Sequence, residues 1–93
     1  MKVGFIGLGN VGASLAGNIL RNGFELIVRD LDSSVTEQFR LMGASVADSP
    51  RKVAEFADVI VTCLPNPEAS ASVMEGENGV LDGLREGHIW IEM

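Results

Sequence analysis

Three glycines near the amino terminus, Gly7, Gly9 and Gly12, have the spacing G-x-G-x-x-G directly after a short apolar run. In a turn that binds the pyrophosphate of a dinucleotide, each of these positions requires a glycine for a different reason. Gly7 lets the chain turn sharply off a strand, Gly9 lets the backbone approach the phosphates, and Gly12 lets the next helix pack closely on that strand. Free N–H groups and the positive end of that helix dipole then face the phosphates. A glycine turn that only packs an α/β domain is the alternative.

An acidic residue, Asp30, follows Gly12 after 18 positions, at the end of a second apolar run. Its carboxylate could accept hydrogen bonds from both ribose hydroxyls of the adenosine, and it would repel a 2′-phosphate. An ordinary surface aspartate is the alternative. Arg29 is predicted to point to the opposite face of the sheet, although its long side chain could reach the adenine or a 2′-phosphate. Together these residues favour NAD over NADP as the cofactor.

Leu64 and Pro65 follow a third apolar run, where an open α/β sheet places its ligands. Contacts made by their backbone would need no particular side chain, and a loop that merely turns is the alternative. His88 lies between a glycine and the last apolar run, and we interpret it as a solvated histidine. The chain contains no Ser/His/Asp set, no carboxylate pair and no metal-ligand spacing. The sequence therefore predicts no catalytic residue and no metal site.

Composition describes a small globular domain. The chain has 93 residues, of which 46% are hydrophobic, and a net charge of −6. The charge leaves no basic face for a nucleic acid. The one cysteine, Cys63, excludes an internal disulfide and is predicted to be a buried structural thiol. No apolar run is long enough for a membrane span, and none of the sequence resembles a signal peptide. We expect a cytoplasmic protein that does not bind a membrane.

Five apolar runs are typical of strands: one that begins at Lys2, and those at 24–30, 44–47, 58–64 and 89–91. The run at 58–64 is almost continuously apolar, as expected of a central parallel strand. Helical patterns separate the runs, so right-handed crossovers give a parallel sheet in the order 3-2-1-4-5. The prediction is a single dinucleotide-binding domain at 1–93, with a Rossmann-type doubly wound α/β fold that is apparently truncated.

The helix patterns carry their own signals. Val11, Leu15 and Ile19 predict an apolar stripe on the first helix, which Gly23 ends. Two further helices are expected to begin with a capping side chain and a proline, at 48–50 and 66–67. The segment from 76 to 87 is rich in glycine and is predicted to consist of turns.

The second helix has the capping-box sequence S-x-x-E at 34–37. Ser34 is therefore predicted to cap it. Val35, Phe39 and Met42 then follow helical spacing until Gly43 ends the helix.

Residues 7–20 resemble the signature G-L-G-x-M-G-x-x-M-A-x-N-L of the β-hydroxyacid dehydrogenases, which include 3-hydroxyisobutyrate, tartronate semialdehyde and 6-phosphogluconate dehydrogenases. Val11 and Leu15 replace the usual methionines, a change that packing tolerates. Glu92 stands where an aspartate is usual. Later landmarks of the family are also matched, at 41–44, 48–50, 57–60, 64–67 and 79–84. The resemblance covers essentially the whole chain.

The resemblance implies that the phosphates lie over Leu8, Gly9, Asn10 and Val11, that the ribose lies on Asp30, and that the bridge toward the nicotinamide follows Leu64 and Pro65. The family's catalytic lysine and much of its substrate pocket belong to a helical second domain, which we expect to be absent.

We therefore expect the cofactor-binding domain of an NAD(P)-dependent oxidoreductase that acts on a small 3-hydroxyacid or its semialdehyde. Alone, the chain should be inactive. A stand-alone nucleotide-binding or regulatory module without redox chemistry is the alternative. The apolar run at 89–91 is expected to be buried by self-association, which would make the protein a homo-oligomer.

Overall fold

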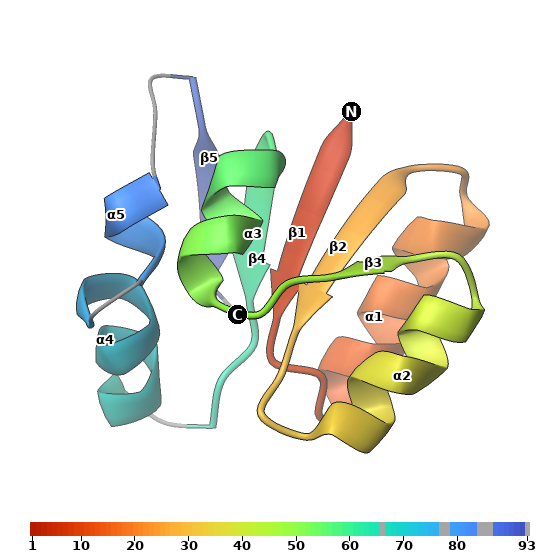
Figure 1. Cartoon of the computed structure of the whole chain (residues 1–93), viewed down its shortest axis with the longest axis horizontal. Helices are drawn as coiled ribbons and strands as arrows, with labels where there is room; N and C mark the ends of the chain where they lie inside the picture. Colours follow the sequence, from red (N-terminus) through yellow and green to blue (C-terminus); the bar gives the residue numbers. More distant parts are fainter. Residues whose placement is uncertain (66, 77–78, 84–86, 93) are drawn as a thin grey trace.

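The structure, a computed structural model of the chain, describes residues 1–65, 67–76, 79–83 and 87–92. Its centre is one parallel sheet with the strand order β3-β2-β1-β4-β5 (Figure 1). The strands are β1 (Lys2–Ile6), β2 (Glu25–Arg29), β3 (Ser45–Val46), β4 (Val59–Thr62) and β5 (Ile89–Glu92). In the middle of the sheet, Phe5 of β1 pairs with Val28 on one side and with Val61 on the other. The predicted fold class and strand order are confirmed.

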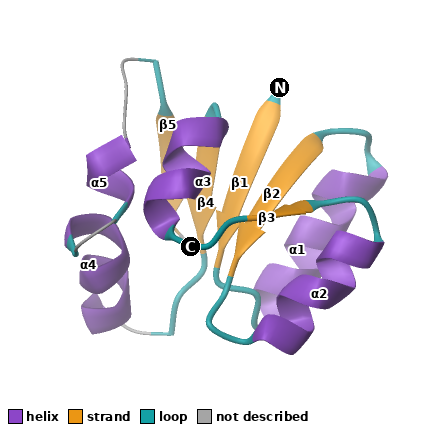
Figure 2. Cartoon of the chain, in the orientation of Figure 1, coloured by secondary structure: helices purple, strands orange, loops and turns teal. Residues whose placement is uncertain are grey.

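Helices cover both faces of this sheet (Figure 2). They are α1 (Asn10–Arg21), α2 (Ser33–Leu41), α3 (Pro50–Phe56), α4 (Pro67–Glu75) and α5 (Val80–Gly83). Ala16 of α1 and Phe39 of α2 pack with Phe5 on one face. Val53 of α3 and Val80 of α5 pack with Ile60 on the other. Side chains of β1 and β4 therefore alternate between two cores, which is why these strands are apolar throughout.

The face of α1 that packs on the sheet differs from the predicted stripe. Val11 is 62% exposed, whereas Gly12 and Ala16 are buried. Leu15 and Ile19 are only partly buried at the edge of the core. Small side chains let the helix axis approach the sheet, so the line of closest contact follows Gly12 and Ala16, and the larger side chains lie beside it. The prediction for Val11 was wrong.

The prediction that Ser34 caps the second helix was also wrong. α2 begins two residues earlier, and its cap is Asp32, whose carboxylate accepts hydrogen bonds from the backbone N–H of Ser34 at 3.0 Å and from its hydroxyl at 2.6 Å. An aspartate caps as well as a serine and lies ahead of it here, so the S-x-x-E pattern falls inside the helix. α2 ends at Leu41, and Met42, which follows the helical spacing in the sequence, is the C-cap and is 53% exposed.

Other helix ends were predicted correctly. Gly23 follows α1 with a positive φ of 86°, and Ser49 caps α3 by accepting from the N–H of Lys52 at 3.3 Å. α4 begins at Pro67, and the cap expected at Asn66 lies outside the described residues. The short helix α5 was not predicted, because it has only four residues and the segment around it is rich in glycine. Its position rests on burial of Val80 in the core rather than on a local helix signal.

β5 forms one edge of the sheet. The side chains of Ile89, Trp90 and Ile91 are all exposed to about half of their area, between 44% and 57%. The indole N–H of Trp90 donates a hydrogen bond of 3.1 Å to the hydroxyl of Thr62, the last residue of β4. Among the helices in the described part of the chain, none is long and apolar enough to cross a membrane.

Candidate functional site

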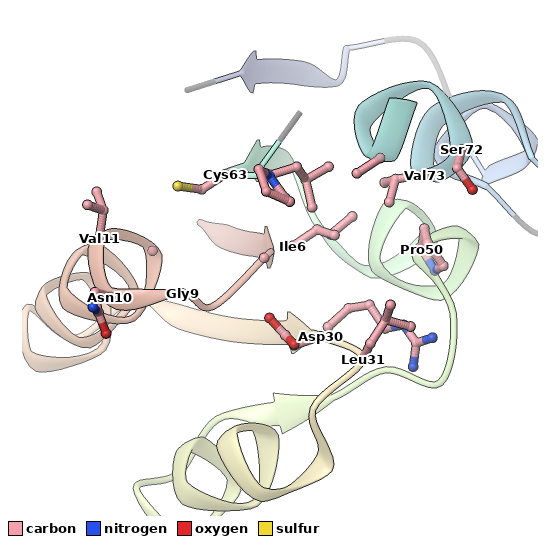
Figure 3. A pocket seen from close by; sticks show the side chains of 16 residues that line it. Ile6, Gly9, Asn10, Val11, Asp30, Leu31, Pro50, Cys63, Ser72 and Val73 are labelled. Carbon is pink, nitrogen blue, oxygen red and sulfur yellow. The ribbon is translucent and has the colours of Figure 1, made fainter. Parts of the chain in front are cut away.

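A cavity of about 770 Å³ opens at the carboxyl ends of β1, β2 and β4, between the start of α1 and the helices α3 and α4 (Figure 3). It brings together nine of the ten residues predicted to bind the cofactor: Gly7, Gly9, Asn10, Val11, Gly12, Arg29, Asp30, Leu64 and Pro65. Leu8 is the exception, because its side chain is buried in the core and only its backbone takes part in the turn.

Gly7 is required by the fold itself. It has a φ of +96°, a conformation that other residues rarely adopt, and a Cβ at this position would lie 2.2 Å from the carbonyl oxygen of Cys63. Its N–H donates to the carbonyl of Arg29 at 3.0 Å, which extends the pairing of β1 with β2 by one residue. Gly7 therefore lies where the carboxyl ends of β1, β2 and β4 meet, in a space too small for a side chain.

Gly12 is required by helix packing. A Cβ there would lie 2.2 Å from the carbonyl oxygen of Gly7 and 3.3 Å from the ring of Phe5. The first turn of α1 thus rests directly on the backbone of the preceding turn. As a result, the start of the helix is held against the ends of the strands, at the edge of the cavity.

Gly9 has no such reason to be a glycine. Its φ of −65° and ψ of −174° suit any residue. No described atom beyond its chain neighbours lies within 4 Å of the place where a Cβ would be. Gly9 is exposed, and it lines the cavity. The protein leaves open space there that a side chain would fill.

Gly9 is also the N-cap of α1, and no side chain caps this helix. The first N–H groups of a helix have no acceptor within it, and here they belong to Asn10, Val11 and Gly12, which all line the cavity. Open space beside uncapped N–H groups at the positive end of a helix dipole is the arrangement that accepts a phosphate. The residues present therefore fit the pyrophosphate of a dinucleotide.

Asp30 follows directly after β2, and both of its carboxylate oxygens accept backbone hydrogen bonds. Oδ2 accepts from the N–H of Leu8 at 2.6 Å, and Oδ1 accepts from the N–H of Asp32 at 2.9 Å. The side chain is partly exposed and lines the cavity beside the glycine turn (Figure 3). A carboxylate oxygen has more than one acceptor site, so Asp30 can still receive bonds from a ligand's hydroxyls.

Arg29 was predicted to point to the opposite face of the sheet unless its long side chain reached the ligand, and it lines the same cavity as Asp30, as that exception allowed. It is the last residue of β2, from which a side chain as long as that of arginine can reach the cavity at the end of the strand. The next residue, Leu31, is 92% exposed and also lines the cavity. Leu31 was not predicted as a lining residue, although an apolar side chain in a polar turn is a signal that could have indicated it.

The far side of the cavity is apolar, and sequence reasoning missed it. Pro50 at the start of α3, and Ala69 and Val73 of α4, form this wall (Figure 3). In the sequence the two α4 residues have the spacing of a core stripe, which looks the same as a stripe that faces a ligand. Ile6 and Ser72 complete the lining that was not predicted.

Cys63 was predicted to be buried, yet it is partly exposed and lines the cavity. β4 ends at Thr62, so Cys63 has already left the sheet. The titratable side chains of the described lining are therefore those of Arg29, Asp30 and Cys63. His88 precedes β5 at the amino-terminal end of the strands, which is the edge opposite the cavity.

Comparison with known proteins identifies relatives that match nearly the whole chain. The chain is 42% identical to YfjR, an uncharacterised oxidoreductase of Bacillus subtilis, over all 93 residues. It is 43% identical over 90 residues to the mitochondrial 3-hydroxyisobutyrate dehydrogenase of Rattus norvegicus. These matches cover 100% and 97% of this chain but only 32% and 27% of the two relatives. The chain thus spans less than a third of the length of these two relatives.

Solved structures are similar in fold. An imine reductase from Myxococcus stipitatus in complex with NADP⁺ superposes with a TM-score of 0.91 at 24% identity, over 100% of this chain and 32% of that one. The 3-hydroxyisobutyrate dehydrogenase of Mycobacterium tuberculosis gives 0.84 at 27% identity, over 98% and 30%. The first of these shows the fold alone.

The family match covers every residue of the glycine turn, of the described cavity lining and of the sheet. It extends from residue 2 to residue 93. This chain belongs to the family described as the NAD-binding domain of 6-phosphogluconate dehydrogenase.

Proposed function

We propose that the cavity holds NAD with its pyrophosphate over the turn from Gly7 to Gly12 and its adenosine ribose on Asp30. The observation that carries this proposal is Gly9, whose missing side chain serves no purpose within the protein and leaves room at the uncapped start of α1. Leu31 and Pro50 offer apolar surface to the adenine ring. The bridge toward the nicotinamide then follows Leu64 and Pro65.

Within this site, Asp30 favours NAD over NADP. Its carboxylate lines the cavity, where it can accept hydrogen bonds from the ribose hydroxyls, and its charge opposes a 2′-phosphate. Arg29 lines the same cavity and is the residue that could favour NADP instead. We expect the chain to bind NADH more tightly than NADPH. The substitution Asp30→Asn should reduce the difference between the two affinities. Tighter binding of NADPH by the parent chain would overturn this preference and assign the phosphate to Arg29.

The whole protein, in this proposal, is an oxidoreductase that transfers a hydride between NAD and a small 3-hydroxyacid or its semialdehyde. The relatives named as 3-hydroxyisobutyrate dehydrogenases support this substrate class. Reduction of a carbonyl also needs a proton donor. The titratable side chains of the described lining are those of Arg29, Asp30 and Cys63, and none of them has the position of the family's catalytic lysine. We place the donor outside this lining, in the second domain that the family resemblance implies. The chain alone should bind NADH without turnover.

A nucleotide-binding module without redox chemistry is the second candidate, because the same cavity would serve it. Assays of the chain within its longest natural reading frame, with NAD and a panel of small 3-hydroxyacids, separate the two. Turnover supports the dehydrogenase. NADH binding with no turnover on any of these substrates supports the module.

The experiment that tests cofactor binding compares the parent chain with Gly9→Val by titration calorimetry with NADH. We expect NADH binding to be lost in the variant while its circular dichroism and melting temperature remain close to those of the parent. Ala71→Val is the matched control, because it adds similar bulk at an exposed position of α4 away from the cavity. Equal NADH affinity in Gly9→Val and the parent would mean that the turn is only structural.

We further propose that the protein is a cytoplasmic homo-oligomer. The support for association is the exposed apolar edge strand β5, with Ile89, Trp90 and Ile91. Light scattering on the purified chain tests it, since a stable monomer would contradict the association. The acidic composition and the lone cysteine favour the cytoplasm.

A further inference from the structure

The carboxylate of Asp30 continues the hydrogen bonding between β1 and β2 beyond the end of the strands. The N–H of Gly7 still finds a backbone acceptor, the carbonyl of Arg29 at 3.0 Å. The N–H of the next residue, Leu8, instead finds the side chain of Asp30, at 2.6 Å. This contact is partly buried, and a charged acceptor makes it shorter and stronger than a bond between neutral groups.

The other oxygen of Asp30 holds the opposite side of the cavity. It accepts from the N–H of Asp32 at 2.9 Å, and Asp32 in turn caps α2 through the N–H of Ser34. One carboxylate therefore joins the turn that leads into α1 to the turn that leads into α2. Without it, the N–H of Leu8 has no acceptor of comparable charge, and Leu8 and Gly9 lose their fixed place beside β2.

We propose that Asp30 is a positioning residue for the phosphate-binding turn, in addition to any contact that it makes with the ribose. This inference rests on the proposed function, because it concerns how the same site receives the pyrophosphate. Asp30 acts through the N–H of Leu8, which fixes the backbone that enters Gly9 and the first turn of α1. The turn is then preorganised, and a ligand does not bear the cost of ordering it.

An asparagine cannot replace the carboxylate in this role. Its amide offers one acceptor oxygen and one donor nitrogen, whereas the backbone presents two donors, the N–H groups of Leu8 and Asp32. In Asp30→Asn one of these N–H groups must face another donor. The variant therefore separates two roles that coincide in the parent: contact with the ribose hydroxyls, and support of the turn.

The test crosses this variant with a change in the ligand. NADH is compared with the analogue that carries 2′,3′-dideoxyadenosine, which keeps the pyrophosphate but lacks the hydroxyls that Asp30 would bind. We expect Asp30→Asn to weaken the analogue about tenfold, the usual effect of losing a hydrogen bond to a charged group, and to weaken NADH more. The control Asp48→Asn makes the same charge change at an exposed site outside the cavity and should alter neither affinity.

If the parent and Asp30→Asn bind the dideoxy analogue equally well, Asp30 acts on the ribose alone and the proposal is wrong. A second measurement does not depend on any ligand. Amide hydrogen exchange of the free protein should show a protected N–H at Leu8 in the parent and at least tenfold faster exchange in Asp30→Asn, with Ala13, which bonds to Gly9, unchanged.

An unprotected Leu8 amide in the parent would overturn the proposal without any variant. Failure of the parent to bind NADH would instead refute the proposed function. In that case the Leu8 exchange rate in Asp30→Asn still decides whether the carboxylate holds the turn, so the two failures are distinguishable.

Discussion

The start of α1 differs from the starts of α2 and α3. Asp32 caps α2 and Ser49 caps α3, so a side chain of the protein accepts one of the free N–H groups at each of these ends. α1 has a glycine at the same position and no side-chain cap. Yet α1 lines the cavity with three consecutive residues of its first turn, Asn10, Val11 and Gly12, whereas the first turn of α3 contributes only Pro50 and that of α2 contributes none. Side chains of the protein therefore accept hydrogen bonds from the free N–H groups at the starts of α2 and α3, whereas those at the start of α1 remain available to an anion.

The same contrast exists within the glycine turn. Gly12 and Gly7 are glycines because backbone atoms lie where a Cβ would be, at 2.2 Å in both cases. Gly9 is a glycine although its surroundings are open. A motif alone therefore does not say which of its residues the fold needs and which the ligand needs. Substitutions that separate stability from binding give that answer.

The largest effect is expected for Gly12→Ala. The new methyl group would meet the carbonyl oxygen of Gly7, and a backbone atom cannot move aside as a side chain can. We expect a loss of about 3 kcal/mol in the free energy of unfolding, the upper part of the range for overpacking. In a domain of this size that is a fall of roughly 12–24 °C in melting temperature. A melting temperature within a few degrees of the parent would show that the turn is looser than its geometry indicates.

A smaller effect is expected for Ser49→Ala, which removes the cap of α3. Loss of the hydrogen bond from the N–H of Lys52 should cost about 1 kcal/mol. Urea unfolding measures the change, and NADH titration serves as the control, because Ser49 does not line the cavity. If stability is unaffected, the side chain is not the functional cap of this helix.

Gly9→Ser is expected to change stability and NADH binding in opposite directions. A serine should cap α1 better than glycine, so we expect stability to rise by a few tenths of a kcal/mol. NADH affinity should fall at least tenfold, because the hydroxymethyl group occupies the open space and competes for the N–H groups that the phosphates need. Parallel melting and calorimetry test this opposition. A variant that is both more stable and equally strong in binding would contradict it.

The smallest effect concerns the cap of α2 at low pH. Hydrogen bonds from the hydroxyl and then the N–H of Ser34 lower the pKa of Asp32. Since the folded-state pKa lies below that of the unfolded chain, the ionised cap adds stability above about pH 4, and this contribution is lost as the pH falls through the lower, folded value. Urea midpoints from pH 6 to pH 3 should decline slightly less for Asp32→Asn than for the parent. Identical declines would assign the acid sensitivity to other carboxylates.

Much of the fold could be predicted because its signals are local and repeated. The apolar runs, the glycine turn, the cap before Pro50 and the proline at 67 define the order of strands and helices, and right-handed crossovers then leave one simple sheet. Local signals failed where tertiary packing decides. Val11 has the spacing of a core residue, but the small residues of α1 give the helix a different contact face.

The cavity was predicted in part for the same reason. Residues in the turn and at the end of β2 follow from the motif, since spacing alone places them. Cys63 was missed because the sequence does not show where β4 ends, and the α4 wall was missed because Val73 looks like any core residue. The hydrogen bond between Asp30 and Leu8 could not be predicted. An aspartate at this position looks the same in the sequence whether its carboxylate binds the backbone or a ligand.

The hydrogen bond between Trp90 and Thr62 has an optical consequence. Trp90 is the only tryptophan of the chain, so its indole dominates the near-ultraviolet emission. Its N–H is bonded to the last residue of β4, and the next residue, Cys63, is part of the cavity wall. The protein thus has an intrinsic fluorophore one residue away from its ligand site. Its emission overlaps the absorption of a reduced nicotinamide, so occupancy of the site can be followed by energy transfer without any label.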